Sequence, residues 1–215
     1  MKAVKGDDDK WYVESKNIIL NGSFLFDFYA GRDFIIQECV DQSDEISQYN
    51  PTSINTLRLS VYRSVKDNKC HVTNAVMRIG GKGSYVDNAH AGGVFVGINP
   101  DGRLCDFVCN QYGNRHTVFN EIDFSKKHII PHYEEIKQFA CEISSLIPHC
   151  RLIALDIVLR KNGKPQLIEF NVAPSSYSMW LFQFTVGPAF GDYTDEIIEY
   201  CSTHLDKVKY YFNPL

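Results

Sequence analysis

The sequence lacks any long apolar run. Over its 215 residues no stretch approaches the roughly 18 to 20 consecutive apolar residues that a membrane-spanning helix needs. The first residues, MKAVKGDDDKWYVESK, also lack the apolar core of a secretory signal. We therefore expect neither a membrane partner nor secretion, and a cytoplasmic location fits best.

The sequence also lacks an excess of positive charge and any spacing typical of a cysteine metal site. It has 22 basic and 26 acidic residues, a formal net charge of −4, and no long basic run, so nucleic acid is not expected as a main partner. The seven cysteines form no CxxC or Cys/His metal spacing. Their odd number, mostly within apolar segments, predicts reduced thiols in the core. No internal repeat or low-complexity segment is evident.

What is present indicates a globular chain of one large domain or two small ones. The apolar run DFIIQECV, residues 33–40, predicts a buried strand. The polar, turn-rich segment DQSDEISQYNPTS that follows it predicts a hinge near residue 42. We therefore expect two parts, residues 1–42 and residues 43–215.

The second part reads as an antiparallel sheet with helices. Apolar and polar residues alternate over residues 54–65, 69–80 and 92–110, with turn signals at 66–68 and 99–102, as in a β-meander. An apolar stripe at helical spacing predicts a helix over 133–147, and a final helix is expected over about 193–210. The aromatic-rich segment 175–191 either packs in the core or faces a substrate, and most of it is expected to be core. This pattern predicts an α+β fold.

The stretch LIALDIVLRKNGKPQLIEFNVAP, residues 152–174, predicts a β-hairpin with an acid in the middle of each strand. If Lys161 faces Lys164 across the Asn-Gly turn, Asp156 lies opposite Glu169, and Asn171 shares the face of Glu169. Three oxygen ligands then converge, which is the chemistry that Mg²⁺ accepts alongside substrate phosphates.

The alternative is an acidic face that merely points to water. We favour the metal site because the acids interrupt runs of Leu, Ile and Val. Opposed like charges destabilise a strand pair, so without metal the replacement of either acid by its amide is expected to be neutral or stabilising.

Two arginines and a glycine-rich loop are further candidates. Arg58 and Arg78 fall near the ends of successive predicted strands, where two guanidiniums beside an acidic pair suit polyphosphate recognition. The alternative is a pair of surface arginines that contribute little. The loop GGKGSYVDNAHAGG, residues 80–93, offers backbone N–H groups and the pair Asp87–Asn88, although such loops are mostly turns. The lone histidines His90 and His116 are interpreted as structural.

Taken in order, FIIQECVDQ, NPTSINTLRLSVYR, MRIGGKGSYVDNAHAGGVFVGINPDG and the acidic hairpin resemble the ATP-grasp fold, specifically its sugar-transfer-associated, capsule-biosynthesis branch. The resemblance spans nearly the whole chain, and the hairpin is its most specific element. It implies that ATP and Mg²⁺ bind here. The residues that it implies are, for the metal, Asp156, Glu169 and Asn171; for the γ-phosphate or acyl-phosphate, Arg58, Arg78 and Asn88; for the adenine hinge and ribose, Gln37, Glu38, Val40 and Asp41; and, for the first grasping strand, Lys2.

The resemblance also implies an ATP-grasp carboxy-terminal lobe with an antiparallel sheet and flanking helices, preceded by a remnant of the nucleotide-clamping lobe. Three aspartates follow Gly6, where such proteins have a glycine-rich phosphate loop, and they oppose an anion. The amino-terminal part of such proteins is expected to be missing. A second copy or a missing segment would then cover the exposed inner face.

The expected activity is Mg-ATP-dependent ligation of a carboxylate to an amine through an acyl-phosphate, on a glycan or a small amino-acid-like acceptor, as in polysaccharide biosynthesis. Two alternatives remain open. One is a phosphotransferase that uses the same site, and the other is a catalytically weak or inactive scaffold that keeps the fold.

Overall fold

The chain folds as two compact units, Met1–Cys39 and Val40–Leu215, each of which is considered by itself. The structure is a computed structural model, and it describes residues 2–14, 18–172 and 176–204. Among these residues, no helix is both long and apolar enough to cross a membrane.

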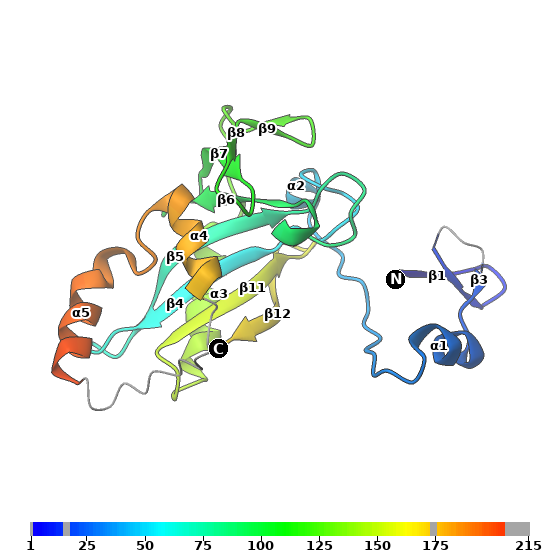
Figure 1. The fold of residues 1–215 in the computed structure, drawn as a ribbon, viewed down its shortest axis with the longest axis horizontal. Coiled ribbons are helices and arrows are strands. Elements are labelled where there is room, and N and C mark those ends of the chain that lie inside the picture. Colours follow the sequence, from blue (N-terminus) through cyan, green and yellow to red (C-terminus); the bar gives the residue numbers. More distant parts are fainter. Residues whose placement is uncertain (1, 15–17, 173–175, 205–215) are drawn as a thin grey trace. The chain divides into compact units, whose positions relative to one another are not determined.

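The first unit is a small antiparallel sheet followed by one helix (Figure 1). The sheet has the order β1-β2-β3, with β1 at Ala3–Lys5, β2 at Trp11–Val13 and β3 at Ile18–Ile19. Helix α1 spans Gly22–Tyr29; the Asn21 side chain caps it by accepting a hydrogen bond from the Phe24 N–H at 2.9 Å. The helix ends at Ala30, which adopts a left-handed conformation.

The strand expected over residues 33–40 does not form. This segment has no regular secondary structure, and the side chains of Ile35 and Ile36 are 82% and 71% exposed. An apolar run becomes a strand only where another strand pairs with its backbone and a second layer covers its side chains. The 39-residue first unit provides neither for this segment, so the prediction is wrong here.

The second unit is built on a seven-stranded sheet in which all neighbouring strands are antiparallel (Figure 1). Its order is β12-β11-β4-β5-β6-β7-β8. The strands are β4 at Leu57–Arg63, β5 at Cys70–Ile79, β6 at Val94–Ile98, β7 at Leu104–Cys109, β8 at Arg115–His116, β11 at Leu152–Leu159 and β12 at Pro165–Asn171.

Several short elements accompany this sheet. They are helix α2 at Asp44–Ser47, the 3-10 helices η1 at Ala89–Ala91 and η2 at Gly191–Tyr193, and a two-stranded hairpin of β9 at Val118–Phe119 and β10 at Ile122–Asp123. The four central strands confirm the predicted meander. The residues Asn68 and Gly102 have positive φ, 59° and 83°, at its two predicted turns.

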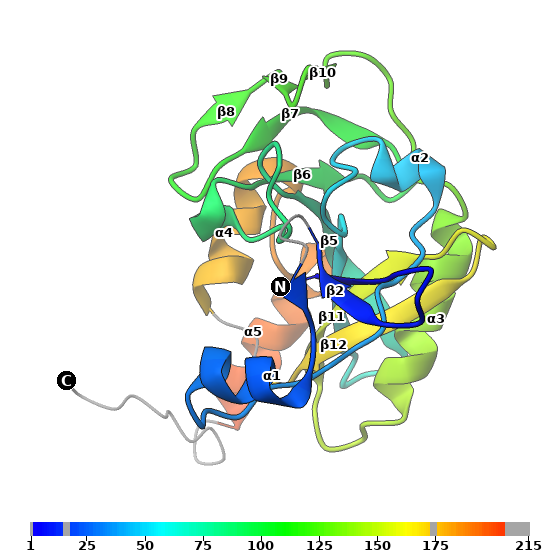
Figure 2. The same cartoon turned by 90° about the vertical axis from the view of Figure 1, so that its right-hand side faces the viewer.

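The sheet carries a helix on each face, as Figure 2 shows. Helix α3, Tyr133–Ser145, confirms the helix predicted over 133–147 and buries Ile136 and Ala140 against one face of the sheet. Odd-numbered residues of the central strands, such as Leu59, Met77 and Leu155, complete this main core.

Helix α4, Ser176–Val186, covers the other face. Its residues Leu181 and Phe182 pack with Val76, Phe95 and Cys109 in a second, smaller core, so the expectation of core packing holds for these two side chains. The final helix, α5, spans Thr194–Thr203, so the predicted helix is confirmed as far as the description reaches. The rest of that prediction lies outside the described residues.

The acidic hairpin forms, but its turn is not the predicted one. The Arg160 N–H donates to the Lys164 carbonyl at 2.9 Å, and the Gly163 N–H donates back to the Arg160 carbonyl at 2.9 Å. Gly163 has a φ of 77°. The loop therefore holds three residues, a tight turn followed by a left-handed glycine, instead of the two-residue turn with Lys161 facing Lys164.

A bulge restores the predicted pairing further along the hairpin. Ile157 pairs with Leu167, one position away from the predicted register, whereas Asp156 pairs with Glu169 as predicted. The register shifts between these two pairs, which leaves Ile168 as an extra residue on the edge strand. The prediction of the acidic pair is confirmed, although the turn geometry behind it was wrong.

Candidate functional site

Four charged side chains gather on the face of the sheet that faces away from α3. On β4, β5 and β11 the odd-numbered residues fill the main core, so alternation directs Arg58, Arg78 and Asp156 to the opposite face. Glu169 on β12 is the cross-strand partner of Asp156, which in turn pairs with Arg58 on its other side. The sheet register thus brings these residues together from four strands.

Arg58 forms the central ion pair of this cluster. Its Nε donates to Oδ1 of Asp156 at 2.6 Å and its Nη2 donates to Oδ2 of the same carboxylate, while Glu169 Oε1 lies 3.5 Å from Nη2. The side chains of Arg58 and Asp156 are only 16% and 3% exposed. Burial works to lower the pKa of Arg58, but the hydrogen bonds to Asp156 and the charges of the nearby carboxylates together outweigh it and raise that pKa. The guanidinium therefore stays charged.

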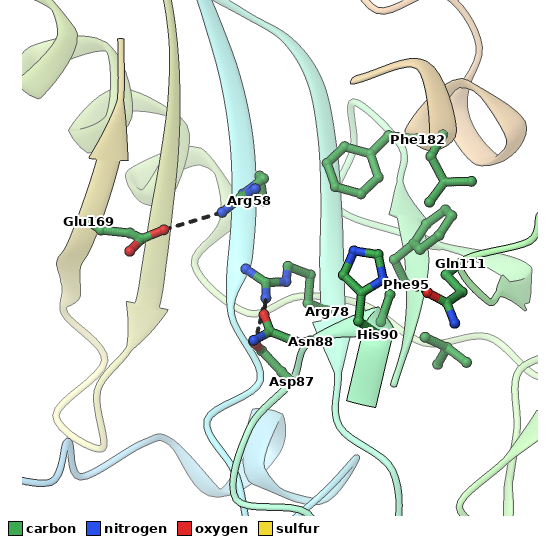
Figure 3. Close-up of a pocket in the computed structure, with 12 residues that line it drawn as sticks. Arg58, Arg78, Asp87, Asn88, His90, Phe95, Gln111, Glu169 and Phe182 are labelled. Atoms are coloured by element: carbon green, nitrogen blue, oxygen red, sulfur yellow. Dashed lines mark hydrogen bonds and ion pairs between the residues drawn. The ribbon is translucent and has the colours of Figure 1, made fainter. Parts of the chain in front are cut away.

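Arg78 is held between two carboxylates and an amide, and Figure 3 shows the Asp87 carboxylate and the Asn88 amide beside it. Its Nη1 lies 3.4 Å from Oδ2 of Asp156, and its Nη2 lies 2.9 Å from Oδ1 of Asp87 and donates to the Asn88 amide oxygen. The other Asp87 oxygen accepts the Thr56 N–H at 3.0 Å. Burial raises the pKa of Asp87, and Arg78 opposes this shift.

The loop over residues 80–93 brings Asp87 and Asn88 to Arg78. A side chain at Gly93 would place its Cβ 2.8 to 3.0 Å from three backbone carbonyl oxygens, so only glycine allows the two ends of the loop to meet. The side-chain amides of Asn50 and Asn120 donate to the carbonyls of the first loop residues at 3.1 and 3.0 Å. The loop is therefore held at its base.

Two cavities open beside the cluster. One has a volume of about 190 Å³ and is lined in part by Arg58, Arg78 and Glu169. The other has a volume of about 250 Å³ and is lined in part by Arg78, Asp156 and Glu169. Both also include Asp87 and Asn88 in their walls. The predicted catalytic residues and two of the three predicted metal ligands thus line these two cavities.

The burial of Asp156 changes what we expect when this acid is replaced by its amide. Asp156 is buried between guanidiniums, so its charge is compensated without metal, whereas the side chain of Glu169 is 58% exposed. Removing the charge of Asp156 would leave two largely buried arginines without their shared partner. This geometry argues against the expectation that Asp156 can be neutralised without loss of stability, and it leaves that expectation in place for Glu169.

The donor set suits a divalent cation together with a phosphate ligand. Asn171 lies beside Glu169, with its Nδ2 3.4 Å from Oε1, so an amide group adjoins the opposed acids. No group of three or more His, Cys, Asp or Glu side chains in the described part of the chain is arranged to hold a metal. The Asn171 amide would therefore have to provide the third ligand beside Asp156 and Glu169. The cluster with Asp87 has two guanidiniums against three carboxylates, a formal charge of −1. A triphosphate would be repelled unless a cation such as Mg²⁺ accompanied it.

Three of the predicted nucleotide contacts meet within the first unit. Lys2, Gln37 and Glu38 line one cavity of about 890 Å³. Its remaining walls are mainly apolar and include Trp11, Leu20, Leu25, Tyr29, Phe34, Ile35 and Ile36. Lys2 Nζ forms an ion pair with Glu14 at 2.8 Å.

The other two predicted contacts belong to the second unit. Val40 begins that unit, and the Asp41 carbonyl accepts a hydrogen bond from the Lys161 N–H at 2.9 Å, which ties the segment to the turn of the acidic hairpin. The predicted roles of these five residues in nucleotide binding stay predictions.

The loop with three aspartates bonds the N–H groups of Gly6, Asp9 and Lys10 internally. The Gly6 N–H donates to the Lys10 carbonyl at 2.8 Å, the Asp9 N–H donates to the Gly6 carbonyl at 3.1 Å, and the Lys10 N–H lies 3.3 Å from Asp8 Oδ1. Asp8 also accepts the Tyr12 hydroxyl at 2.8 Å, which lowers the pKa of Asp8. These donors do not point outward as in a phosphate-binding loop.

Sequence reasoning missed three residues of the site. Asp87 was noted only as part of a polar pair, His90 was interpreted as structural, and Gln111 was not considered. All three line the smaller cavity. No periodicity marks them, because they lie in loops or in the short helix η1, which only the fold brings to the sheet.

Comparison with known families provides an independent line of evidence. No curated protein matches the chain. Residues 19–197 match the family described as sugar-transfer associated ATP-grasp. ATP-grasp proteins generally bind ATP with Mg²⁺, and the family indicates ATP-dependent ligase or transferase chemistry in the context of sugar transfer. Because the match covers most of the chain, this protein belongs to the sugar-transfer-associated ATP-grasp family.

Proposed function

We propose that this protein joins a carboxylate to an amine in a Mg-ATP-dependent reaction that passes through an acyl-phosphate. The observation that supports this most is the set of two arginines and opposed acids on one sheet face, beside two cavities. The second unit would be the carboxy-terminal lobe of the fold, and the first unit would contribute the nucleotide clamp. The acceptor would be a glycan or a small amino-acid-like molecule.

In this reaction a carboxylate oxygen of the acceptor attacks the γ-phosphorus of ATP, and ADP leaves. The amine nitrogen then attacks the acyl carbon, phosphate leaves with the bonding electron pair, and the nitrogen loses a proton to give the amide. Arg58 and Arg78 would donate N–H groups to the phosphoryl oxygens, where charge develops in the transition state. No side-chain nucleophile is needed.

The two arginines are suited to this role because they are held before any ligand arrives. Asp156 orients Arg58 through two hydrogen bonds, and Asp87 orients Arg78 while accepting a backbone N–H itself. Donors that are already oriented lose little free energy in reorganisation when the reaction proceeds. When bound, Mg²⁺ held by Asp156, Glu169 and Asn171 would neutralise charge on the phosphates.

A catalytically weak or inactive protein is the second candidate, favoured by the loop over residues 6–10. The N–H groups of Gly6, Asp9 and Lys10 are bonded within the loop, and the carboxylates of Asp8 and Asp9 pair with Lys10 and Lys5. Such a loop offers little to a triphosphate, and each absent charge-assisted bond to a phosphate would cost about 1.5 to 3 kcal/mol of binding.

Trapping with hydroxylamine separates the candidates, because an acyl-phosphate reacts with hydroxylamine to give a hydroxamate. The protein would be incubated with Mg-ATP, hydroxylamine and a panel of sugar acids and amino acids, and the hydroxamate, ADP and phosphate would be quantified. We expect all three products from at least one acceptor. A phosphorylated acceptor that hydroxylamine does not cleave would instead show a phosphotransferase, and the absence of products would favour the inactive protein.

A matched pair of variants controls the assay. Glu169→Gln should abolish hydroxamate formation, whereas Glu142→Gln, an exposed acid on α3 at the opposite face, should not change it. Equal activity in both variants would place the reaction outside this site.

A further inference from the structure

The cavity of about 190 Å³ continues beyond the charged cluster to an uncharged end. The guanidiniums of Arg58 and Arg78 lie at one end with the carboxylates (Figure 3). The other end is lined by Ala89, His90, Val94, Phe95, Gln111, Leu181 and Phe182. The reaction proposed above uses the charged end and leaves the uncharged end without a role.

The uncharged end has a polar pair on one wall. His90 Nδ1 lies 2.5 Å from the Gln111 amide oxygen, and both side chains face the cavity (Figure 3). His90 belongs to the 3-10 helix η1, and Gln111 follows β7 in a turn that the Asn110 side chain stabilises. An imidazole and an amide can each donate and accept hydrogen bonds, as a hydroxyl group can.

Two aromatic rings form its floor. Phe95 on β6 and Phe182 on α4 pack edge to face, with ring centroids 5.2 Å apart, and they are only 1% and 6% exposed. They belong to the second core between the sheet and α4, so they are fixed in place. An apolar floor beneath a polar wall matches a sugar ring, whose C–H groups are apolar and whose edge carries hydroxyls.

The size and charges of the cavity narrow the class of ligand. A volume of about 190 Å³ lies below the roughly 300 to 1,000 Å³ of sites for drug-sized ligands, so it suits one small ring and not an oligosaccharide chain. Among the described residues that line it, the cations are Arg58, Arg78 and, when protonated, His90, and the carboxylates are Asp87 and Glu169 at the charged end. An amino acid also carries an ammonium group, which would need a carboxylate partner, and the described residues of the uncharged end include none.

We propose that this uncharged end is the acceptor subsite and that it takes a sugar ring bearing a carboxylate. The carboxylate points to Arg58 and Arg78, and the hydroxyls bond His90 and Gln111. This inference rests on the proposed ligase function, for which it names the class of acceptor. His90 and Gln111 then determine specificity and take no part in phosphoryl transfer.

Three probes separate the contributions to binding: D-glucuronate, D-glucose, which lacks the carboxylate, and cyclohexanecarboxylate, which lacks the hydroxyls. Their dissociation constants would be measured on the full chain by ligand-observed NMR in the presence of Mg²⁺, because without a cation the charged cluster carries a formal charge of −1. We expect glucuronate to bind at least about tenfold more tightly than glucose, because glucose lacks the charge-assisted contact to the arginines. Relative to cyclohexanecarboxylate, each hydrogen bond that a glucuronate hydroxyl makes should tighten binding by about 3- to 10-fold.

Gln111→Leu should weaken the binding of glucuronate by about 3- to 10-fold and leave the binding of cyclohexanecarboxylate unchanged. The matched control, Gln138→Leu on the outer surface of α3, should change neither. The proposal is overturned if glucuronate does not bind, if it binds no better than cyclohexanecarboxylate, or if Gln111→Leu weakens both acids equally.

A parallel titration of the wild-type protein with Mg-ATP distinguishes the two proposals. Glucuronate binding that responds to Gln111→Leu without any Mg-ATP binding would refute the ligase function and keep the carbohydrate subsite. Mg-ATP binding with no preference among the three probes would keep the ligase function and refute the subsite.

Discussion

Asp156→Asn should destabilise the metal-free protein, whereas Glu169→Gln should not. The two acids face each other across one strand pair, but only Asp156 is buried, and it alone accepts from both Arg58 and Arg78. The asparagine keeps one oxygen and turns an N–H group toward a guanidinium. The two substitutions therefore compare a buried and an exposed carboxylate in the same cluster.

The expected magnitude follows from these contacts. Breaking a buried ion pair by removing one partner costs about 3 to 5 kcal/mol, and we expect the lower end, about 3 kcal/mol, because Glu169 and Asp87 still face the arginines. Glu169 is 58% exposed and 3.5 Å from Arg58, so its loss should cost under about 1 kcal/mol.

Urea unfolding in the presence of EDTA, followed by circular dichroism, measures both values. For a chain of this size about 3 kcal/mol corresponds to roughly 6 to 12 °C in Tm, which a thermal scan would show independently. Equal stability of the two variants, or a more stable Asp156→Asn protein, would refute the compensation of Asp156 by the arginines.

Three further predictions concern other parts of the chain. Arg58→Ala should weaken binding of Mg-ATP by about 1.5 to 3 kcal/mol in calorimetry and leave adenosine binding unchanged. Arg58→Lys should restore little of this loss, since a lysine cannot donate two parallel hydrogen bonds as a guanidinium does. Equal losses for both ligands would place Arg58 away from the phosphates. Replacing residues 7–9 by glycine should tighten Mg-ATP binding, since it removes three carboxylates from the loop; an unchanged Kd would mean that the loop does not face the nucleotide. Burial raises the pKa of Glu196, but hydrogen bonds from Ser64, Val65 and Tyr62 outweigh this effect and lower that pKa. The ionised Glu196 therefore contributes its full stabilising free energy above about pH 4.3, the pKa of an unfolded glutamate. This stabilisation is lost as the pH falls through the lowered pKa of the folded state. Glu196→Gln should flatten the acid limb of the stability curve measured by urea unfolding, and parallel curves for the two proteins would contradict this.

The sheet and its main helix could be predicted from the sequence because periodicity reports burial. Alternation over residues 57–79 and the stripe from Tyr133 reflect the same core between the sheet and α3. The same alternation explains why Arg58 and Arg78 share a face with Asp156. Their positions near strand ends, combined with the acidic hairpin, were enough to indicate the site.

Other features could not be predicted because they depend on distant parts of the fold. The three-residue turn shifts the strand pairing by one residue and the bulge at Ile168 shifts it back, and no local sequence pattern reveals either. The run over residues 33–40 has the composition of a strand without the partner that a strand needs. The cavity wall of His90 and Gln111 joins two loops that are far apart in the sequence, so only the structure could bring them to one cavity.

The central claim is that the cluster around Asp156 and Glu169 binds a nucleotide together with a divalent cation. The most direct test is calorimetric titration of the wild-type chain with a non-hydrolysable ATP analogue, once with Mg²⁺ and once with EDTA. The account predicts binding that requires Mg²⁺ and that Glu169→Gln weakens by more than about tenfold, the loss of one charged ligand. The same dissociation constant in EDTA, or no effect of Glu169→Gln, would contradict it.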